Sequence, residues 1–144
     1  MSEENKALSR RFLDETQNNK NLATVDELIA PNFVGHTAGV RGIEGLKEAI
    51  RANLTAFPDL QTTIEDQISD GNKVVSRYTA RATHKGVYHG VAPTGKQVTY
   101  TAIAIHSFTD GKIVEGWRVV DRLNIMEQLG AISYGEKSRS TIPS

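Results

Sequence analysis

The fold is decided by residues 97–120, which read QVTYTAIAIHSFTDGKIVEGWRVV. Apolar and polar side chains alternate with a period of two on both sides of Asp110-Gly111, a dipeptide typical of turns between antiparallel strands. The pattern predicts a β-hairpin with strands at 97–108 and 113–120. We expect Thr109, Asp110 and Gly111 to form a three-residue loop, with a type I turn followed by glycine in the left-handed position.

The length of this loop determines which side chains share a face. A three-residue loop pairs Phe108 with Lys112 and His106 with Val114. One face then has small residues at its centre and a histidine and an arginine toward its edges, and we assign it to a ligand pocket. It carries Tyr100, Ala102, Ala104, His106, Val114, Gly116, Arg118 and Val120. A one-residue change in the loop reverses the faces and turns Glu115, Trp117 and Asp121 inward, and this alternative stays open.

The opposite face of the hairpin is predicted to be the convex side of the sheet. It carries Ile103, Ile105, Ile113, Glu115, Trp117 and Val119. This apolar area is too large to leave exposed to water, so we predict a homodimer through the convex face.

Outside the hairpin, the chain reads as helices first and strands afterwards. Apolar stripes predict helices near the N-terminus, at about 22–29 and at about 43–57, where Pro58 ends the third. Strands are expected at 60–69 and 73–84, a short extra strand at 86–92, and a last helix at 121–129 followed by Gly130. This order is α+β: a curved, cone-shaped antiparallel sheet covered by the N-terminal helices. We expect one domain at 1–134 and a polar tail at 135–144.

Composition excludes several classes of function. The 144 residues carry 17 basic and 17 acidic side chains, so the formal charge is zero, which argues against a nucleic-acid or anionic-membrane partner. There is no cysteine, and neither a signal peptide nor a membrane span is evident. We therefore expect a cytoplasmic protein. No histidine spacing supports a metal site and no nucleotide-binding motif is present, so we expect neither a metal nor a cofactor.

Four short motifs carry a resemblance to a known family. They are FPDL at 57–60, GVAPTGK at 90–96, DGKIVEGW at 110–117 and QLG at 128–130. In this order and spacing the chain resembles the SnoaL-like polyketide cyclases, within the nuclear-transport-factor-2-like superfamily. The resemblance implies a cystatin-like, cone-shaped α+β barrel, a homodimer, no cofactor, and ring closure of a polyketide by intramolecular aldol condensation (an ester cyclase). Aligned on the 110–113 turn, the family's acid/base aspartate falls at Arg118 and a family histidine falls at Ala104.

The candidate catalytic residues are His106, Asp121 and Arg118. A histidine can act as a general base near neutral pH. Asp121 is the carboxylate nearest the end of its strand, but it also stands where an N-cap of the last helix belongs. Arg118 cannot be a base, but it can bind a carboxylate or stabilise an enolate oxygen. Candidate ligand contacts are the pocket face together with Tyr78, Trp117, His36 and His84, although Trp117 suits packing or a dimer contact equally well.

Three functions remain open at this stage. The first is a cofactor-free acid/base enzyme, a cyclase or an isomerase, acting on a small polyketide-like or other carbonyl compound. The second is a binding protein that holds a small hydrophobic ligand without turning it over. The third is an enzyme resembling limonene-epoxide hydrolase or ketosteroid isomerase, which would need buried carboxylates such as Glu65 or Asp66.

Overall fold

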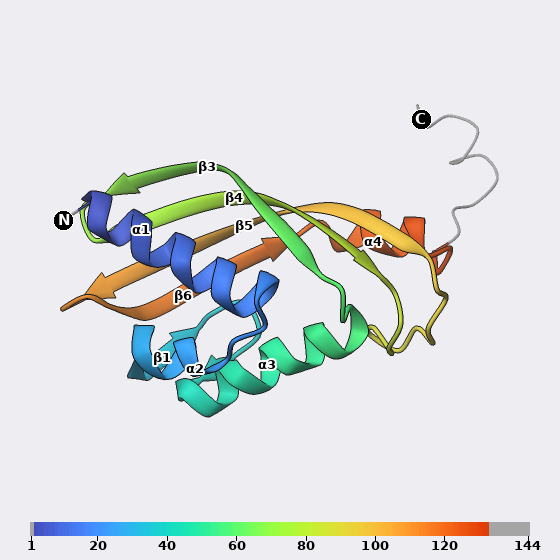
Figure 1. Cartoon of the computed structure of the whole chain (residues 1–144), viewed down its shortest axis with the longest axis horizontal. Coiled ribbons are helices and arrows are strands. Elements are labelled where there is room, and N and C mark those ends of the chain that lie inside the picture. Colours follow the sequence, from blue (N-terminus) through green and yellow to red (C-terminus); the bar gives the residue numbers. More distant parts are fainter. Residues whose placement is uncertain (1, 133–144) are drawn as a thin grey trace.

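Six strands form one curved sheet in the order β2-β1-β6-β5-β4-β3, as the computed structural model of residues 2–132 shows (Figure 1). The first and last strands in this order are free edges, so the sheet is not closed into a barrel. The predicted tail at 135–144 lies outside the described residues. The strands are β1 Ile29–Gly35, β2 Val40–Arg41, β3 Gln61–Asp70, β4 Lys73–Thr83, β5 Gln97–Thr109 and β6 Lys112–Val120.

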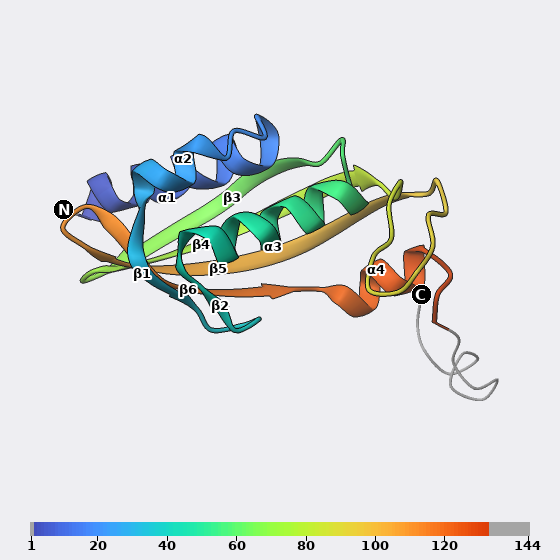
Figure 2. The same ribbon diagram turned by 90° about the horizontal axis from the view of Figure 1, so that it is seen from below.

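Helices cover one face of this sheet. The N-terminal helix α1 (Ser2–Leu13) continues into a π-helical segment, η1 (Asp14–Asn18), and is followed by α2 (Ala23–Leu28) and α3 (Gly42–Ala56). In Figure 2 these helices lie on the same side of the sheet, while α4 (Arg122–Gln128) lies at the far end of β6. The predicted α+β architecture, with N-terminal helices folded over a curved sheet, is confirmed.

Helix α3 shows how the sequence builds this layer. Ile43, Leu46, Ile50 and Leu54 recur at spacings of three and four, which places them on one side of the helix. That side packs against the core formed under α1 and β1 and, further along, against a second core near α4. The helix ends at Ala56 because Pro58 disfavours helical geometry at the residue before it.

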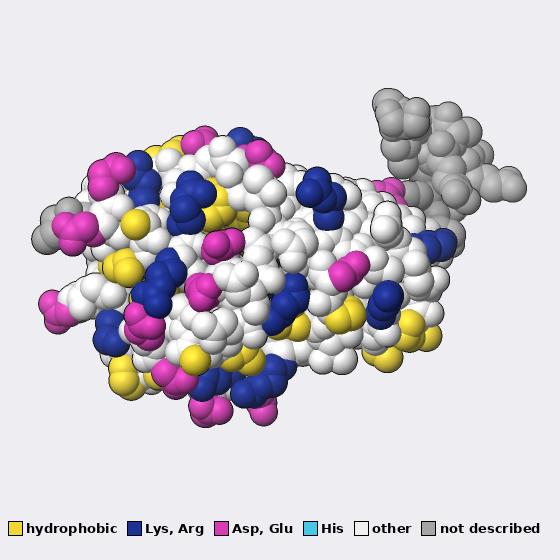
Figure 3. All heavy atoms as spheres, in the orientation of Figure 1, with side chains coloured by type: hydrophobic (Ala, Val, Ile, Leu, Met, Phe, Trp, Pro, Cys, Tyr) yellow, Lys and Arg dark blue, Asp and Glu magenta, His cyan; other side chains and the backbone are white. Residues whose placement is uncertain are grey.

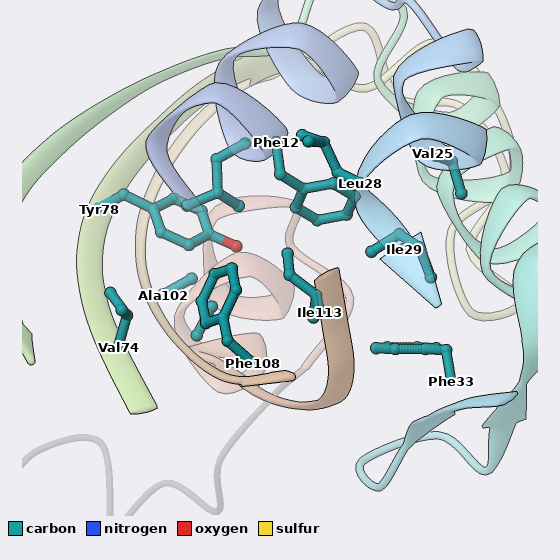
Figure 4. Close-up of a cluster of buried hydrophobic side chains, with 12 residues drawn as sticks. Phe12, Val25, Leu28, Ile29, Phe33, Val74, Tyr78, Ala102, Phe108 and Ile113 are labelled. Carbon is teal, nitrogen blue, oxygen red and sulfur yellow. The ribbon is translucent and has the colours of Figure 1, made fainter. Parts of the chain in front are cut away.

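The core has two parts. The larger lies under α1 and α2 and includes the aromatic rings of Phe12, Phe33, Tyr78 and Phe108. Figure 4 shows the Tyr78 ring pointing into this cluster from β4. The smaller part joins Phe57 to α4 and to β4 and β5. Val120 of β6 packs against both parts and so joins them.

The hairpin differs from its predicted geometry in two ways that largely cancel. Asp110 (φ +50°) and Gly111 (φ +74°) are both left-handed, so the loop has two residues, and Thr109 pairs with Lys112. Such a loop alone would reverse the faces. A β-bulge restores them, because Phe108 pairs with Ile113 but Ser107 pairs with Glu115, which leaves Val114 as the extra residue.

The bulge corrects two predicted orientations. Ile113 is fully buried in the core and Val114 is not, so their predicted sides were exchanged. Beyond the bulge, His106 pairs with Gly116 and Ala104 pairs with Arg118, so the predicted partners, Val114 and Gly116, were wrong. The predicted inward face is confirmed for Tyr100, Ala102, Ala104 and His106, all of which are buried.

The N-terminal half contains strands that the sequence did not indicate. The chain leaves α2 directly into β1, which pairs with β6 in parallel, whereas the other strand pairs are antiparallel. The short strand expected at 86–92 is wrong: this segment forms only a single bridge, between Tyr88 and Val91.

The surface carries charges of both signs and scattered apolar side chains (Figure 3). On the face shown in Figure 3, basic and acidic side chains are interspersed. Among residues 2–132, no helix is both long and apolar enough to cross a lipid bilayer.

Candidate functional site

A cavity of about 350 Å³ lies between the sheet and the helices. Its wall is mostly apolar and comes from α1, η1, β1, α3, β5 and β6. Its polar lining residues are Thr16, Gln17, Thr37, Asn53, His106, Arg118 and Arg122, and the part of the chain that the structure describes contributes no Asp or Glu to it. A second depression of about 580 Å³, near Asn32 and Val114, is more open to solvent. The first cavity is the less open of the two and is mostly apolar, which is the character of a ligand site.

Arg118 reaches this cavity from β6. Its Nε donates a hydrogen bond to the Tyr78 hydroxyl over 3.0 Å, and its backbone N–H donates to Thr37 Oγ1 over 2.8 Å. Burial alone would lower the pKa of Arg118, but the phenols of Tyr78 and Tyr100 outweigh it and leave the pKa above its ordinary value. The guanidinium therefore stays charged. The Arg118 side chain is half-buried, and its accessible part lines the cavity.

His106 lines the same cavity from β5. The residue is 6% exposed, and its Nδ1 lies 2.9 Å from Ser9 Oγ on α1, while Phe12 packs edge-on against its ring. Burial lowers the pKa of His106 to about 4, so the imidazole is neutral at pH 7. The Ser9 hydroxyl can donate or accept, and when Nδ1–H donates to it, Nε2 keeps a free lone pair.

Strand register places these two residues within reach of one small ligand. His106 lies opposite Gly116 and Arg118 lies opposite Ala104, so His106 and Arg118 are diagonal neighbours on one face of the hairpin. Diagonal neighbours are about 7–8 Å apart. In the predicted register Arg118 lies opposite Ala102 and not Ala104, which is two residues further from His106 along β5. Gly116 leaves room here for the Phe33 ring, whose Cζ would lie 3.1 Å from a Cβ at this position.

Two tyrosines stand behind the cavity wall. Tyr78 is 1% exposed and accepts the hydrogen bond from Arg118. Burial raises the pKa of Tyr100 to about 12, and the side chain of Asn53 on α3 opposes this shift only weakly. The Tyr78 hydroxyl holds Arg118 in position at the cavity surface.

Comparisons with known proteins agree with this geometry. The family model for SnoaL-like polyketide cyclases matches residues 7–129. The chain belongs to this family. None of the curated proteins matches the sequence.

Several solved structures superpose over most of the chain. AclR from Streptomyces galilaeus, a candidate hydroxylase, is 28% identical with a TM-score of 0.83, over 92% of this chain and 100% of that one. TsrD from Streptomyces laurentii is 28% identical with a TM-score of 0.84, over 92% and 98%. IdmH from Streptomyces antibioticus, a candidate polyketide cyclase, is 34% identical with a TM-score of 0.72, over 82% and 93%.

The structure places only part of the predicted site at the cavity of this SnoaL-like chain. His106, Arg118, Ala104, Gly116 and Trp117 line it. Tyr78, Tyr100 and Ala102 are buried in the core but are not among the lining residues.

Asp121 is exposed, and its Oδ1 accepts the backbone N–H of Asn124 over 3.2 Å, so it caps α4 rather than reaching the cavity. Val114 lines the outer depression instead of the cavity, because it is the extra residue of the bulge. Glu65 and Asp66 are exposed on β3.

The two other candidate histidines also lie elsewhere. His84 is fully buried, but its Nδ1 accepts the backbone N–H of Thr94 over 3.2 Å, so it holds the loop between β4 and β5. His36 lies on the surface, where its ring stacks on Trp117 at 4.6 Å and its Nε2 lies 2.9 Å from Glu115 Oε2. Within residues 2–132 no group of three or more His, Asp or Glu could hold a metal ion.

Sequence reasoning missed the polar lining that comes from the helices. Gln17 and Asn53 stand on η1 and α3, and Arg122 opens α4. Asn53 was recognisable only as a polar residue one position before the apolar stripe residue Leu54. The Gln17 side-chain oxygen is buried without a hydrogen-bond partner in the described structure, which leaves it available to a ligand.

Proposed function

We propose that this SnoaL-like protein is a cofactor-independent enzyme that moves a proton on a small polyketide-like or other carbonyl compound. The observation that supports this most is the diagonal pair of His106 and Arg118 in one apolar cavity. A neutral imidazole can accept an acidic proton next to a carbonyl group, and a guanidinium can stabilise the enolate oxygen that forms.

In this proposal each residue has one task. Ser9 accepts the Nδ1–H of His106 and so leaves Nε2 as the base. The proton of the carbon acid goes to Nε2, and the electron pair of the C–H bond becomes the enolate, whose oxygen binds Arg118. The resulting imidazolium is buried, and the enolate beside it compensates for the charge. Tyr78 holds Arg118 in place through its hydroxyl. Aldol ring closure or isomerisation would follow from the enolate.

Isotope exchange tests the proton transfer without knowledge of the natural substrate. The C2 proton of a β-keto ester is followed by NMR in deuterated buffer, with and without protein. We expect catalysed exchange that rises with pH through about 4 and is constant above it, because His106 must be neutral. His106→Gln and Arg118→Met should each abolish the catalysed part.

Asp121→Asn is the matched control for this assay. Asparagine is also a good N-cap, so α4 remains capped, and exchange should be unchanged. Loss of exchange in this variant but not in His106→Gln would move the base to Asp121 and refute the proposal.

A binding protein without turnover is the second candidate. It is favoured by the lack of any Asp or Glu among the described lining residues and by the low pKa of His106, which makes that residue a weak base. Tight binding of β-keto esters with no catalysed exchange at any pH would support this function and exclude the first.

A further inference from the structure

Arg118 is a half-buried cation for which residues 2–132 supply no counterion. Among residues 2–132 the hydrogen-bond partner of its side chain is the neutral hydroxyl of Tyr78, and no carboxylate lies within ion-pair distance. The described lining of the cavity adds a second cation, Arg122, and no acid. A charge removed from water without a partner is costly, so proteins pair buried charges.

The donors left over on Arg118 have a definite shape. A guanidinium presents five N–H donors in a planar fork. Nε is occupied by Tyr78, and the two terminal nitrogens have no partner in the described structure. This remaining edge matches the two oxygens of a carboxylate, which it can bind with two parallel hydrogen bonds. A neutral ketone or ester would offer the edge a single weaker acceptor.

The rest of the cavity restricts the ligand's body. Phe12, Phe33, Ile50 and Ile113 are among the apolar residues that line it. A volume of about 350 Å³ suits a molecule of one to a few rings. The ligand thus needs one anionic end and one apolar end.

We infer that the cavity selects a small apolar carboxylic acid, bound in its ionised form with the carboxylate on Arg118. This names the ligand class of the proposed functional site, and it rests on the proposed function only in taking the cavity as the ligand site. It does not depend on proton transfer by His106. The carboxylate is present before any reaction, unlike the enolate, so binding alone reveals it.

A matched pair of probes isolates the charge. We compare 3-cyclohexylpropanoate with 3-cyclohexylpropanamide at pH 7.5 by calorimetry, which needs no reporter group in the cavity. Charge-assisted hydrogen bonds predict that the wild-type protein binds the acid at least about tenfold more tightly than the amide. This comparison requires no variant.

Variants then assign the preference to one residue. Arg118→Met should bring the two Kd values to within about twofold or threefold of each other, whereas Arg118→Lys should keep part of the preference because it keeps the charge. Arg122→Met tests the other arginine of the lining, while Arg77→Met, which removes an exposed arginine of β4 outside the lining, is the matched control and should leave the preference intact.

Three results would overturn the inference. Equal binding of acid and amide by the wild type removes it and leaves the proposed proton transfer untouched. A preference that survives Arg118→Met but disappears in Arg122→Met would show that the carboxylate binds Arg122 of α4 and not Arg118. If neither probe binds, the cavity is not a site for small apolar ligands, and the proposed function falls together with the inference.

Discussion

The buried neutral state of His106 makes the stability of the protein depend on pH in a way that can be measured. The folded pKa of about 4 lies below the ordinary value of 6.5, so the unfolded chain takes up a proton first as the pH falls. The stabilisation from a neutral buried ring is therefore complete above about pH 6.5 and is lost between about pH 6.5 and 4. Linkage between these two values gives a loss of about 2 kcal/mol by pH 5.

Replacing His106 by glutamine removes this titration. We expect the free energy of unfolding, measured with urea, to fall by about 2 kcal/mol more between pH 7.5 and pH 5 in the wild type than in His106→Gln. Other titrating groups are shared by both proteins and cancel in the comparison. The variant is expected to be less stable than the wild type at pH 7.5, but only the change with pH enters the test.

Ser9→Ala separates desolvation of the ring from its hydrogen bond. This variant loses the contact to Nδ1 and should lose about 1 kcal/mol at both pH values, while the slope between them persists because the ring remains buried. If the wild type and His106→Gln lost the same stability between pH 7.5 and 5, His106 would not be held neutral in the fold, and the general base of the proposed mechanism would lose its basis.

Substitutions at four further positions test the packing, a helix cap and the cavity. Gly86→Ala should destabilise by about 1–3 kcal/mol or more in urea unfolding, because its Cβ would lie 2.2 Å from the backbone oxygen of Thr55. Gly45→Ala, within α3 and free of close contacts, should instead stabilise by about 0.4–1 kcal/mol, and destabilisation here would contradict the helix geometry. Asp121→Ala should lose about 1 kcal/mol in thermal unfolding, as expected for an N-cap, while Asp121→Asn should not. Gly116→Ala should weaken binding of the carboxylate probe in calorimetry without unfolding the protein, because the methyl group presses on the Phe33 ring beside the cavity; unaltered affinity would show that the ligand does not reach this part of the sheet.

Local patterns in the sequence predicted the elements that build the fold. The apolar stripe of α3, the alternation of β5 and the capping position of Asp121 depend on neighbours a few residues away, and each was read correctly. Strand β1 depends instead on a parallel partner more than eighty residues later in the chain, β6, and it contains Pro31. A proline demotes a short run as a strand candidate, so nothing local indicated β1.

The candidate site was predictable only where one face of the hairpin formed it. Ala104, His106, Gly116 and Arg118 were found because one face of the hairpin has small residues at its centre and a histidine and an arginine toward its edges. His84 was misplaced because residues 84–96 form a loop that draws its imidazole toward Thr94 and away from the cavity, a contact that no strand pattern contains.

The relative position of His106 and Arg118 depends on the bulge at Val114, which adds to the register shift of the two-residue loop. The two-residue loop shifts the register by one residue, and the bulge shifts it by one more, so the face is kept while Arg118 moves one pair closer to His106. Without the bulge the two side chains would lie on opposite faces of the sheet. With the three-residue loop predicted from sequence they would share a face but lie about 13 Å apart along it, at about 3.3 Å per residue. That separation is too great for two groups that act on adjacent atoms of a small carbonyl compound. A single inserted residue on an otherwise regular strand thus determines whether this cavity can combine a base with an oxyanion or carboxylate site.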